Sequence, residues 1–275
     1  MGGKAAARSG LFPEALSPAT ACPIADGGEG DATEPMTTVL LNNVDHNDLH
    51  VITRHGPEFG DAVSQVLVFP TEFESVQREY PIVFRRDAEG ALRPVALLGL
   101  SRDENLFLDG AGGWRSSYIP ALLQRGPFSI GAPDTAEGEP MIRIDLEHPR
   151  VSRSEGTPIF LPQGGNSAYL EHIAGVLRTI YVGHHLLDPM IAAFEGAGLL
   201  QPVNLEARVS ETEVYAVSEV LTIDRGRLAA LGGDELFALH QRGFLQSAFL
   251  AAASLGNVQR LADLKSRPRT GGEPQ

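Results

Sequence analysis

Apolar residues recur every three or four positions through one stretch in the second half of the chain. They are Leu170, Ile173, Leu177, Ile180, Tyr181 and His184, and this spacing predicts an amphipathic helix. Asn166-Ser167 precedes the helix, and both residue types cap helix N-termini well. Asp188-Pro189 predicts a stop, followed by a second helix with Asp188 as N-cap and Pro189 at its first position. Gly196 and Gly198 end that second helix.

A different pattern follows, in which apolar and polar residues alternate. Alternation over residues 203–209, and again over 215–223 with Glu219 out of phase, predicts two strands. Residues 210–212 connect them, so the pattern favours an antiparallel hairpin with one solvated face.

The last part of the chain returns to helical spacing. Asp224 is expected to cap a short turn and Asp234 the next helix, with a break at Gly232-Gly233. Gly243 ends that helix. A buried stripe of apolar residues then continues to Leu264.

The first half contains short apolar segments separated by Gly, Pro and Asp. The predicted strands cover residues 49–53, 63–69, 82–85, 95–100, 106–108 and 141–146. Residues 87–90 form a hairpin turn, and short helices are expected over 72–79 and 119–124. The fold class is therefore α+β. Mixed or antiparallel short strands make up the N-terminal half, and helices with a β-hairpin make up the C-terminal half.

The two ends of the chain lack any periodic apolar pattern. Residues 1–35 are rich in Ala, Gly, Pro, Ser and Glu, which predicts a disordered extension or a translation start assigned too early. A cleaved signal or lipoprotein anchor before Cys22 is less favoured, because prolines and a glutamate interrupt the apolar run. We expect a globular domain over residues 36–266 and a flexible tail over 267–275.

Composition narrows the function classes. The 275 residues have a net charge of −13, which argues against a nucleic-acid partner because phosphate binding needs clustered cations. The single Cys22 provides neither a disulfide nor a thiolate metal site. The longest uncharged stretch, residues 243–259, is shorter than the roughly 20 residues of a membrane span. We expect an acidic, soluble, cytoplasmic protein without a transmembrane segment.

Three blocks of sequence carry a resemblance to a known family. The first is Glu72-Phe73 with Tyr80-Pro81-Ile82-Val83-Phe84. The second and most specific comprises Ala96-Leu97-Leu98-Gly99-Leu100, Asn105-Leu106-Phe107-Leu108-Asp109-Gly110, Trp114-Arg115-Ser116-Ser117-Tyr118-Ile119-Pro120-Ala121 and Arg125-Gly126-Pro127-Phe128. The third runs from Val214-Tyr215-Ala216-Val217 through Gly243-Phe244-Leu245 to Ser254-Leu255. In this order the blocks resemble the SapC family of bacterial proteins, over about Met36 to Leu264. Gly126 and Glu213-Val214 depart from the usual family pattern.

The resemblance implies an accessory role in the cell but does not identify a catalysed reaction. Family members are labelled S-layer proteins or peptide-transport permeases, and their genes tend to lie near outer-membrane receptors and flavin-dependent halogenases. This context implies an accessory protein of uptake or modification that engages a protein or peptide partner. The permease label conflicts with the absence of any span-length apolar stretch. Two alternatives stay open: a metal- or oxygen-dependent enzyme of halogenase-type pathways, and a surface-layer structural protein.

The densest group of candidate ligand-binding residues is Trp114, Tyr118, Arg125 and Phe128. An aromatic platform with an arginine suits a peptide or carboxylate ligand. The alternative is that Trp114 and Phe128 fill the core while Arg125 pairs with an acid. Both interpretations remain open at this point.

Other candidate patterns are better explained by local structure. His46-Asn47-Asp48 has the spelling of two ligands of an iron triad but no identifiable third ligand. His184-His185 with Asp188 has metal-like spacing, and Gly164-Gly165-Asn166-Ser167 resembles an anion-binding loop without its lysine. We therefore predict no metal and no cofactor. The catalytic residues, if the protein is an enzyme, stay unknown, and the patterns favour a protein that is not an enzyme.

Overall fold

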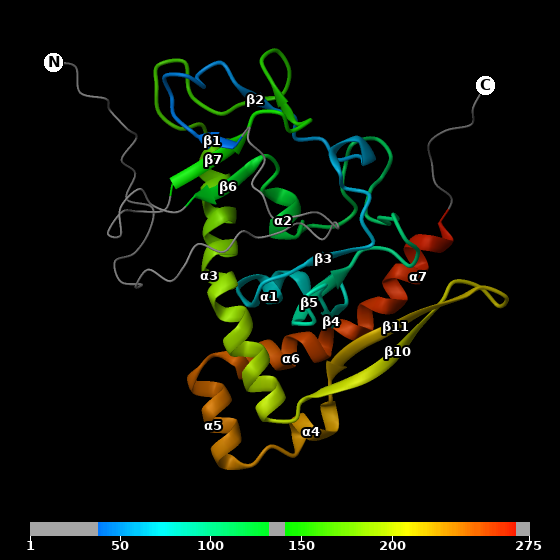
Figure 1. Ribbon diagram of the computed structural model, residues 1–275. Coiled ribbons are helices and arrows are strands. Elements are labelled where there is room, and N and C mark those ends of the chain that lie inside the picture. Colours follow the sequence, from blue (N-terminus) through cyan, green and yellow to red (C-terminus); the bar gives the residue numbers. More distant parts are fainter. Residues whose placement is uncertain (1–37, 132–140, 268–275) are drawn as a thin grey trace. The chain divides into compact units, whose positions relative to one another are not determined.

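The computed structural model describes residues 38–131 and 141–267, so the predicted extension over 1–35 and most of the predicted tail lie outside the described residues. The chain forms two compact units, each made from two separate stretches (Figure 1). Of the described residues, unit 1 holds 38–53, 124–131 and 141–181, and unit 2 holds 54–123 and 182–267. Helices and antiparallel strands occur together, which confirms the α+β class.

Unit 1 contains two small antiparallel sheets. One has the order β1 (Thr38–Leu40), β7 (Met141–Asp145), β6 (Phe128–Gly131), and the other has the order β8 (Val151–Ser152), β2 (His50–Val51), β9 (Thr157–Pro158). Their apolar interior includes Leu49, Phe128, Ile144 and Ile159. Arg150 is also buried in this unit, and its guanidinium donates to the carbonyl of Ile52 at 3.0 Å.

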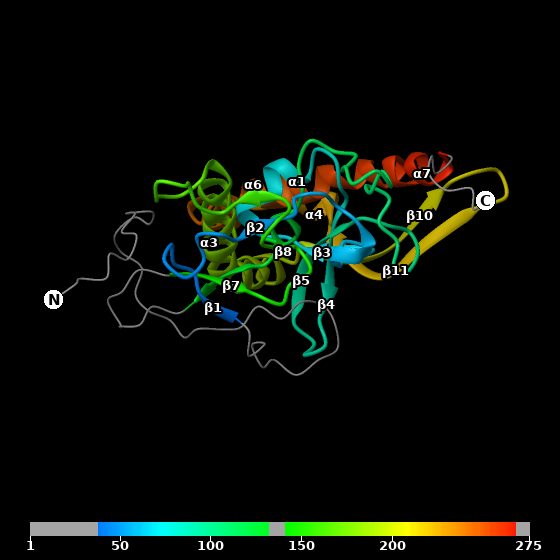
Figure 2. The same ribbon diagram turned by 90° about the horizontal axis from the view of Figure 1, so that it is seen from above.

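Unit 2 contains a five-stranded antiparallel sheet. Its order is β10 (Leu200–Arg208), β11 (Val214–Ile223), β4 (Ile82–Arg86), β5 (Leu92–Leu97), β3 (Gln65–Leu67). Both predicted hairpins are present, and Figure 2 shows that they point in different directions. Accordingly β11 pairs with β4 only where Leu221 faces Phe84. The out-of-phase Glu219 has φ 57° and lies where the β10–β11 register shifts.

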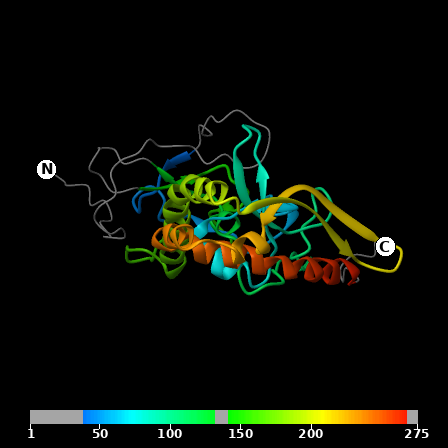
Figure 3. The same ribbon diagram turned by 90° about the horizontal axis from the view of Figure 1, so that it is seen from below.

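Helices pack against this sheet within unit 2. Helix α6 (Phe244–Ser254), the 3-10 turn η3 (Leu255–Asn257) and helix α7 (Val258–Ser266) follow one another in a line beside the β10–β11 hairpin (Figure 3). The shorter elements are η1 (Pro57–Phe59), η2 (Pro70–Glu72), α1 (Phe73–Val76), α2 (Ala121–Gln124), α4 (Arg225–Ala229) and α5 (Gly233–Gln241). The core between them contains Tyr80, Phe84, Phe107 and Phe194, all fully buried. α2 begins in unit 2 and ends in unit 1.

The prediction of two helices separated at Asp188-Pro189 is wrong. A single helix, α3 (Ala168–Gly196), runs through Pro189. Its N-terminus is capped as expected, since Ser167 Oγ accepts from the Leu170 amide at 3.3 Å. Asp188 pairs with Arg93 of β5 at 2.5 Å instead of capping a new helix. Met190, the residue after Pro189, is fully buried together with the apolar face of α3 to which it belongs. The free energy gained by this burial outweighs the hydrogen bond lost at the proline, so the helix continues.

Smaller corrections concern segment ends. Residues 106–108 form no strand; Phe107 is buried in a loop, and Leu108 makes only an isolated bridge to Trp114. Helix α5 is capped at Gly232 rather than Asp234, because Glu235 Oε2 accepts the Gly232 amide at 2.9 Å. Strands β1, β6, β8 and β9 were not predicted, since two to four residues are too few to display a period. Within the described residues, no helix is both long and apolar enough to cross a membrane.

Candidate functional site

A glycine-rich loop precedes the segment 114–118 and sets its direction. Asp109 Oδ1 accepts the amides of Ala111 at 2.7 Å and Gly113 at 2.8 Å, and these bonds lower the pKa of Asp109. Gly110 and Gly112 have φ of 82° and 92°, a region that side chains disfavour. A Cβ on Gly113 would lie 2.3 Å from the Asp109 carboxylate. The conformation of the loop thus depends on its glycines, and the loop places Trp114 at the edge of the core.

One side of segment 114–118 is anchored on Tyr80. The Trp114 indole Nε1 donates to the Tyr80 hydroxyl at 2.8 Å, and that hydroxyl donates to the Tyr118 carbonyl at 2.5 Å. Ser116 Oγ joins the same cluster and accepts from Trp114 Nε1 at 2.9 Å. Burial raises the pKa of Tyr80 to about 12, so the hydroxyl keeps its proton at neutral pH. Trp114 is only partly buried, with its ring stacked 6.1 Å from Phe107.

A buried carboxylate continues this anchoring at Tyr118. Glu72 is 3% exposed, and its Oε2 accepts from the Tyr118 hydroxyl at 2.8 Å and the Ala121 amide at 2.9 Å. Its Oε1 accepts the Phe69 amide at 3.1 Å. Burial raises the pKa of Glu72 above its usual value although three donors oppose this shift. None of these three donors carries a charge, so Glu72 serves the fold at this position.

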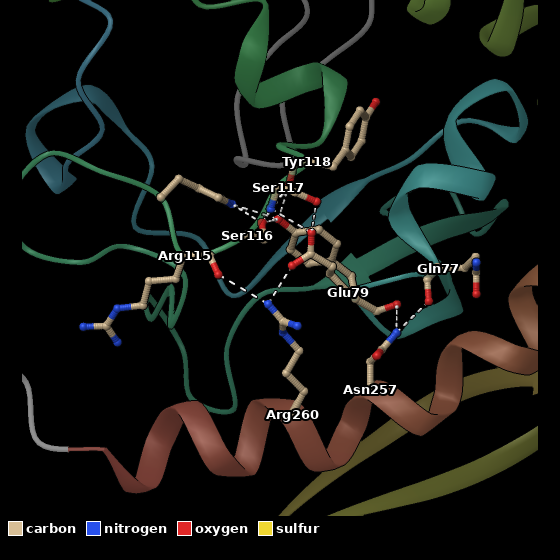
Figure 4. Close-up of polar contacts among 10 residues, drawn as sticks. Gln77, Glu79, Arg115, Ser116, Ser117, Tyr118, Asn257 and Arg260 are labelled. Carbon is tan, nitrogen blue, oxygen red and sulfur yellow. Dashed lines mark hydrogen bonds and ion pairs between the residues drawn. The ribbon is translucent and has the colours of Figure 1, made fainter.

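The other side of the segment meets helix α7 through a second carboxylate. Glu79 accepts from the Ser117 amide at 2.7 Å and from Arg260 Nη2 at 2.6 Å (Figure 4). Arg260 Nη2 also donates to the Arg115 carbonyl at 3.3 Å. Asn257, one turn earlier, donates to the Gln77 carbonyl at 2.7 Å and so fixes the start of α7. The spacing of three residues puts Asn257 and Arg260 on the same side of the chain, facing this segment.

Beside this contact lies an open pocket of about 470 Å³. Its lining residues are Arg115, Arg260, Asp263, Leu264 and Arg267. The four from residue 260 onward recur at spacings of three and four, so one face of α7 and its C-cap form a wall. Three arginines against one aspartate make this lining basic in a chain whose net charge is −13.

The Arg115 side chain is available to the pocket. Figure 4 shows it extending away from the hydrogen bonds that hold its own backbone. Its guanidinium makes no hydrogen bond within residues 38–131 and 141–267. The Arg115 charge contributes to the low pKa of Asp109. The pocket lining therefore contains one arginine held by a carboxylate, Arg260, and two further arginines, Arg115 and Arg267.

The four predicted ligand-binding residues belong to both units. Trp114 and Tyr118 are brought together in unit 2 through Tyr80. In unit 1, Arg125 Nη1 donates to the Phe128 carbonyl at 3.2 Å. Phe128 is fully buried, with its ring 6.2 Å from that of Tyr169.

The sequence interpretation did not single out Arg115, Arg260 or Arg267. Arg115 stands between Trp114 and Ser116 in the most specific block, and its type alone gave no reason to select it. The usable signal was the spacing of Arg260, Leu264 and Arg267, which puts two cations on one face of a helix. The residue that faces them comes from 145 positions earlier in the chain and could not be identified from spacing.

The histidine patterns have local partners. His46 Nδ1 accepts from the Asn42 amide at 3.1 Å, and Asp48 forms an ion pair with Arg153. Burial lowers the pKa of His184. In the part of the chain that the structure describes, no three His, Cys, Asp or Glu side chains are grouped so as to hold a metal ion.

Comparison with known proteins identifies the family. The SapC family model matches residues 41–261, so the chain belongs to the SapC family. The match includes most of both units and two of the five pocket-lining residues, Arg115 and Arg260, whereas Asp263, Leu264 and Arg267 lie beyond its end. No curated protein and no solved structure matches the chain.

Proposed function

Because the chain belongs to the SapC family, we propose that it is an accessory binding protein that engages a protein or peptide partner in a bacterial uptake or modification system. The pocket between segment 114–118 and α7 is the binding site in this proposal. Its place of action is the cytoplasm.

The observation that carries the proposal is the basic pocket itself. Arg260 is held by Glu79, and the backbone that carries Arg115 is held by Arg260 and by the Tyr80 cluster. A site whose groups are already positioned loses little conformational entropy when a partner binds. Guanidinium groups are also enriched among the residues that contribute most to protein interfaces.

The candidate residues have distinct roles in this proposal. Trp114 and Tyr118 position Arg115 by anchoring the segment on Tyr80 and Glu72. Arg125, which donates to the backbone carbonyl of the buried Phe128, is a separate candidate contact on unit 1.

The test is capture of partners from the native cell by full-length protein and by its variants. We expect a partner that is enriched by the unaltered protein and lost with Arg115→Gln. Arg102→Gln is the matched control, because Arg102 is 93% exposed, lies outside the pocket lining and changes the net charge equally. Equal capture by both variants, or no partner above a tag-only control, would contradict the proposal.

Arg125→Ala separates the two units in the same experiment. Loss of capture with this variant, at unchanged thermal stability, would add the unit 1 arginine to the interface. Unchanged capture would remove Arg125 and Phe128 from the candidate contacts and leave the pocket as the site.

Two further measurements address the alternative functions. Stoichiometric iron or zinc in protein purified without a histidine tag would favour the metal- or oxygen-dependent enzyme. Recovery of the protein from the cell surface after fractionation would favour the surface-layer role.

A further inference from the structure

The charged residues of the pocket indicate which chemical group of a partner or ligand could bind there. Its lining has three guanidiniums, of which Glu79 already neutralises one. Asp263 offsets another, although Gln259 Nε2 also donates to it at 3.0 Å. Within the lining about one positive charge then remains for a ligand, because the Asp109 carboxylate that interacts with Arg115 lies outside the lining. This charge matches a singly charged anion better than a doubly charged phosphate.

The geometry favours a planar anion. Guanidinium groups present paired donors that match the two oxygens of a carboxylate, and such charge-assisted bonds are among the stronger polar contacts in proteins. Arg115 and Arg267 reach the pocket from different segments, the loop and the end of α7. Leu264, between Arg260 and Arg267 on the helix face, is 6% exposed and supplies the apolar part of the lining.

We propose that the pocket between segment 114–118 and α7 binds a carboxylate group, with Arg115 and Arg267 as the contacting guanidiniums and Arg260 as a contact positioned by Glu79. This inference rests on the proposed function only for the location of the site. A carboxylate reaches the pocket either as the C-terminus of a peptide or as a small organic acid. The net charge of −13 repels such ligands at long range, so the affinity depends on these local arginines and falls with added salt.

The experiment uses full-length protein and three probes: propionate, inorganic phosphate, and an N-acetylated Gly-Gly-Gly-Leu peptide as free acid or C-terminal amide. Trp114, the only tryptophan, precedes Arg115 in the chain, so its fluorescence reports the titrations. We expect saturation by a carboxylate probe at about 10 mM or below, as for millimolar affinity. Arg115→Gln and Arg267→Gln should each weaken binding about tenfold, the effect of one lost charged hydrogen bond, while Arg102→Gln leaves it unchanged.

The two carboxylate probes distinguish the sources. Tighter binding of the peptide acid than of its amide assigns a peptide C-terminus, and binding of propionate with no binding of either peptide form assigns a small acid. The inference is overturned if phosphate binds more tightly than either carboxylate, if the peptide acid and its amide both bind with equal affinity, if no carboxylate saturates, or if Arg102→Gln weakens binding as much as Arg115→Gln. Partner capture that depends on Arg115 without any preference for the free acid would refute this inference and leave the proposed function standing. Carboxylate binding without a captured partner would do the reverse.

Discussion

Two carboxylates hold opposite sides of segment 114–118, and they differ in every property that matters for function. Glu72 is 3% exposed, receives only uncharged donors, and has a raised pKa because of burial. Glu79 has a side chain that is 12% exposed and pairs with Arg260, whose side chain is 38% exposed at the pocket. Alternate residues follow this division: Trp114, Ser116 and Tyr118 turn to the Tyr80 and Glu72 side, while Arg115 and Ser117 turn to the other. One short segment thus has a structural side and, in our proposal, a binding side.

The largest expected effect comes from removing the buried carboxylate. Glu72→Ala leaves the Tyr118 hydroxyl and two amides without an acceptor, and we expect a loss of about 4 kcal/mol in the free energy of unfolding. Glu79→Ala should cost only about 1 kcal/mol, because water can reach Arg260. Urea unfolding followed by circular dichroism measures both. Similar losses for the two variants would contradict the division into two sides.

Trp114 tests how far the structural side extends toward the surface. Trp114→Ala should cost about 3 kcal/mol, at the lower end for large aromatic residues because the ring is only partly buried. Trp114→Phe keeps most of the packing against Phe107 and loses the bond to Tyr80, for which we expect about 1 kcal/mol. Thermal and urea unfolding by circular dichroism give both values. A negligible loss for Trp114→Ala would move this residue to the binding side.

The smallest effect is the pH dependence that the raised pKa of Glu72 should produce. Its raised folded-state pKa means that the folded protein keeps a proton which the unfolded chain releases above about pH 4.3. The stability contributed by this proton is therefore present at low pH and is lost as pH rises through the folded pKa. Glu72→Gln carries no such proton, so the stability advantage of the unaltered protein over this variant should shrink between about pH 4 and pH 8.

Glu74→Gln provides the reference for that measurement. Glu74 lies two residues after Glu72, in α1, with a side chain 65% exposed, so it corrects for the loss of one carboxylate. If the stability advantage of the unaltered protein over Glu72→Gln grows with pH, the effect of the three donors on the Glu72 pKa outweighs the effect of burial. Glu72 would then be charged in the folded protein.

Local patterns predicted much of the fold because the forces behind them are local. The alternation over residues 203–223 predicted a hairpin, and even the irregularity at Glu219 corresponds to a register shift. Ser167 and Asp224 cap helices as their types indicate. The failure at Pro189 has the opposite origin, since tertiary burial of the α3 face overrides a local breaking signal.

The candidate site shows the same limit. Trp114 and Tyr118 were selected because an aromatic platform beside an arginine suits a peptide or carboxylate ligand. The structure brings the two residues together through Tyr80, which the site prediction did not include. Arg115 and Arg260 are separated by 145 residues, and their contact exists only once Asn257 has fixed α7 beside the end of α1.

By itself the sequence determined the α+β class, the hairpins, the helix caps at Ser167 and Asp224 and the family, since these depend on residue type and on spacing within a few turns or strands. Only the tertiary structure decided which carboxylate is buried and which one borders a pocket. Glu72 and Glu79 are seven residues apart and of one type, so no local rule separates them. Their difference arises from what packs on each: uncharged donors and core on Glu72, and an arginine from a distant helix on Glu79.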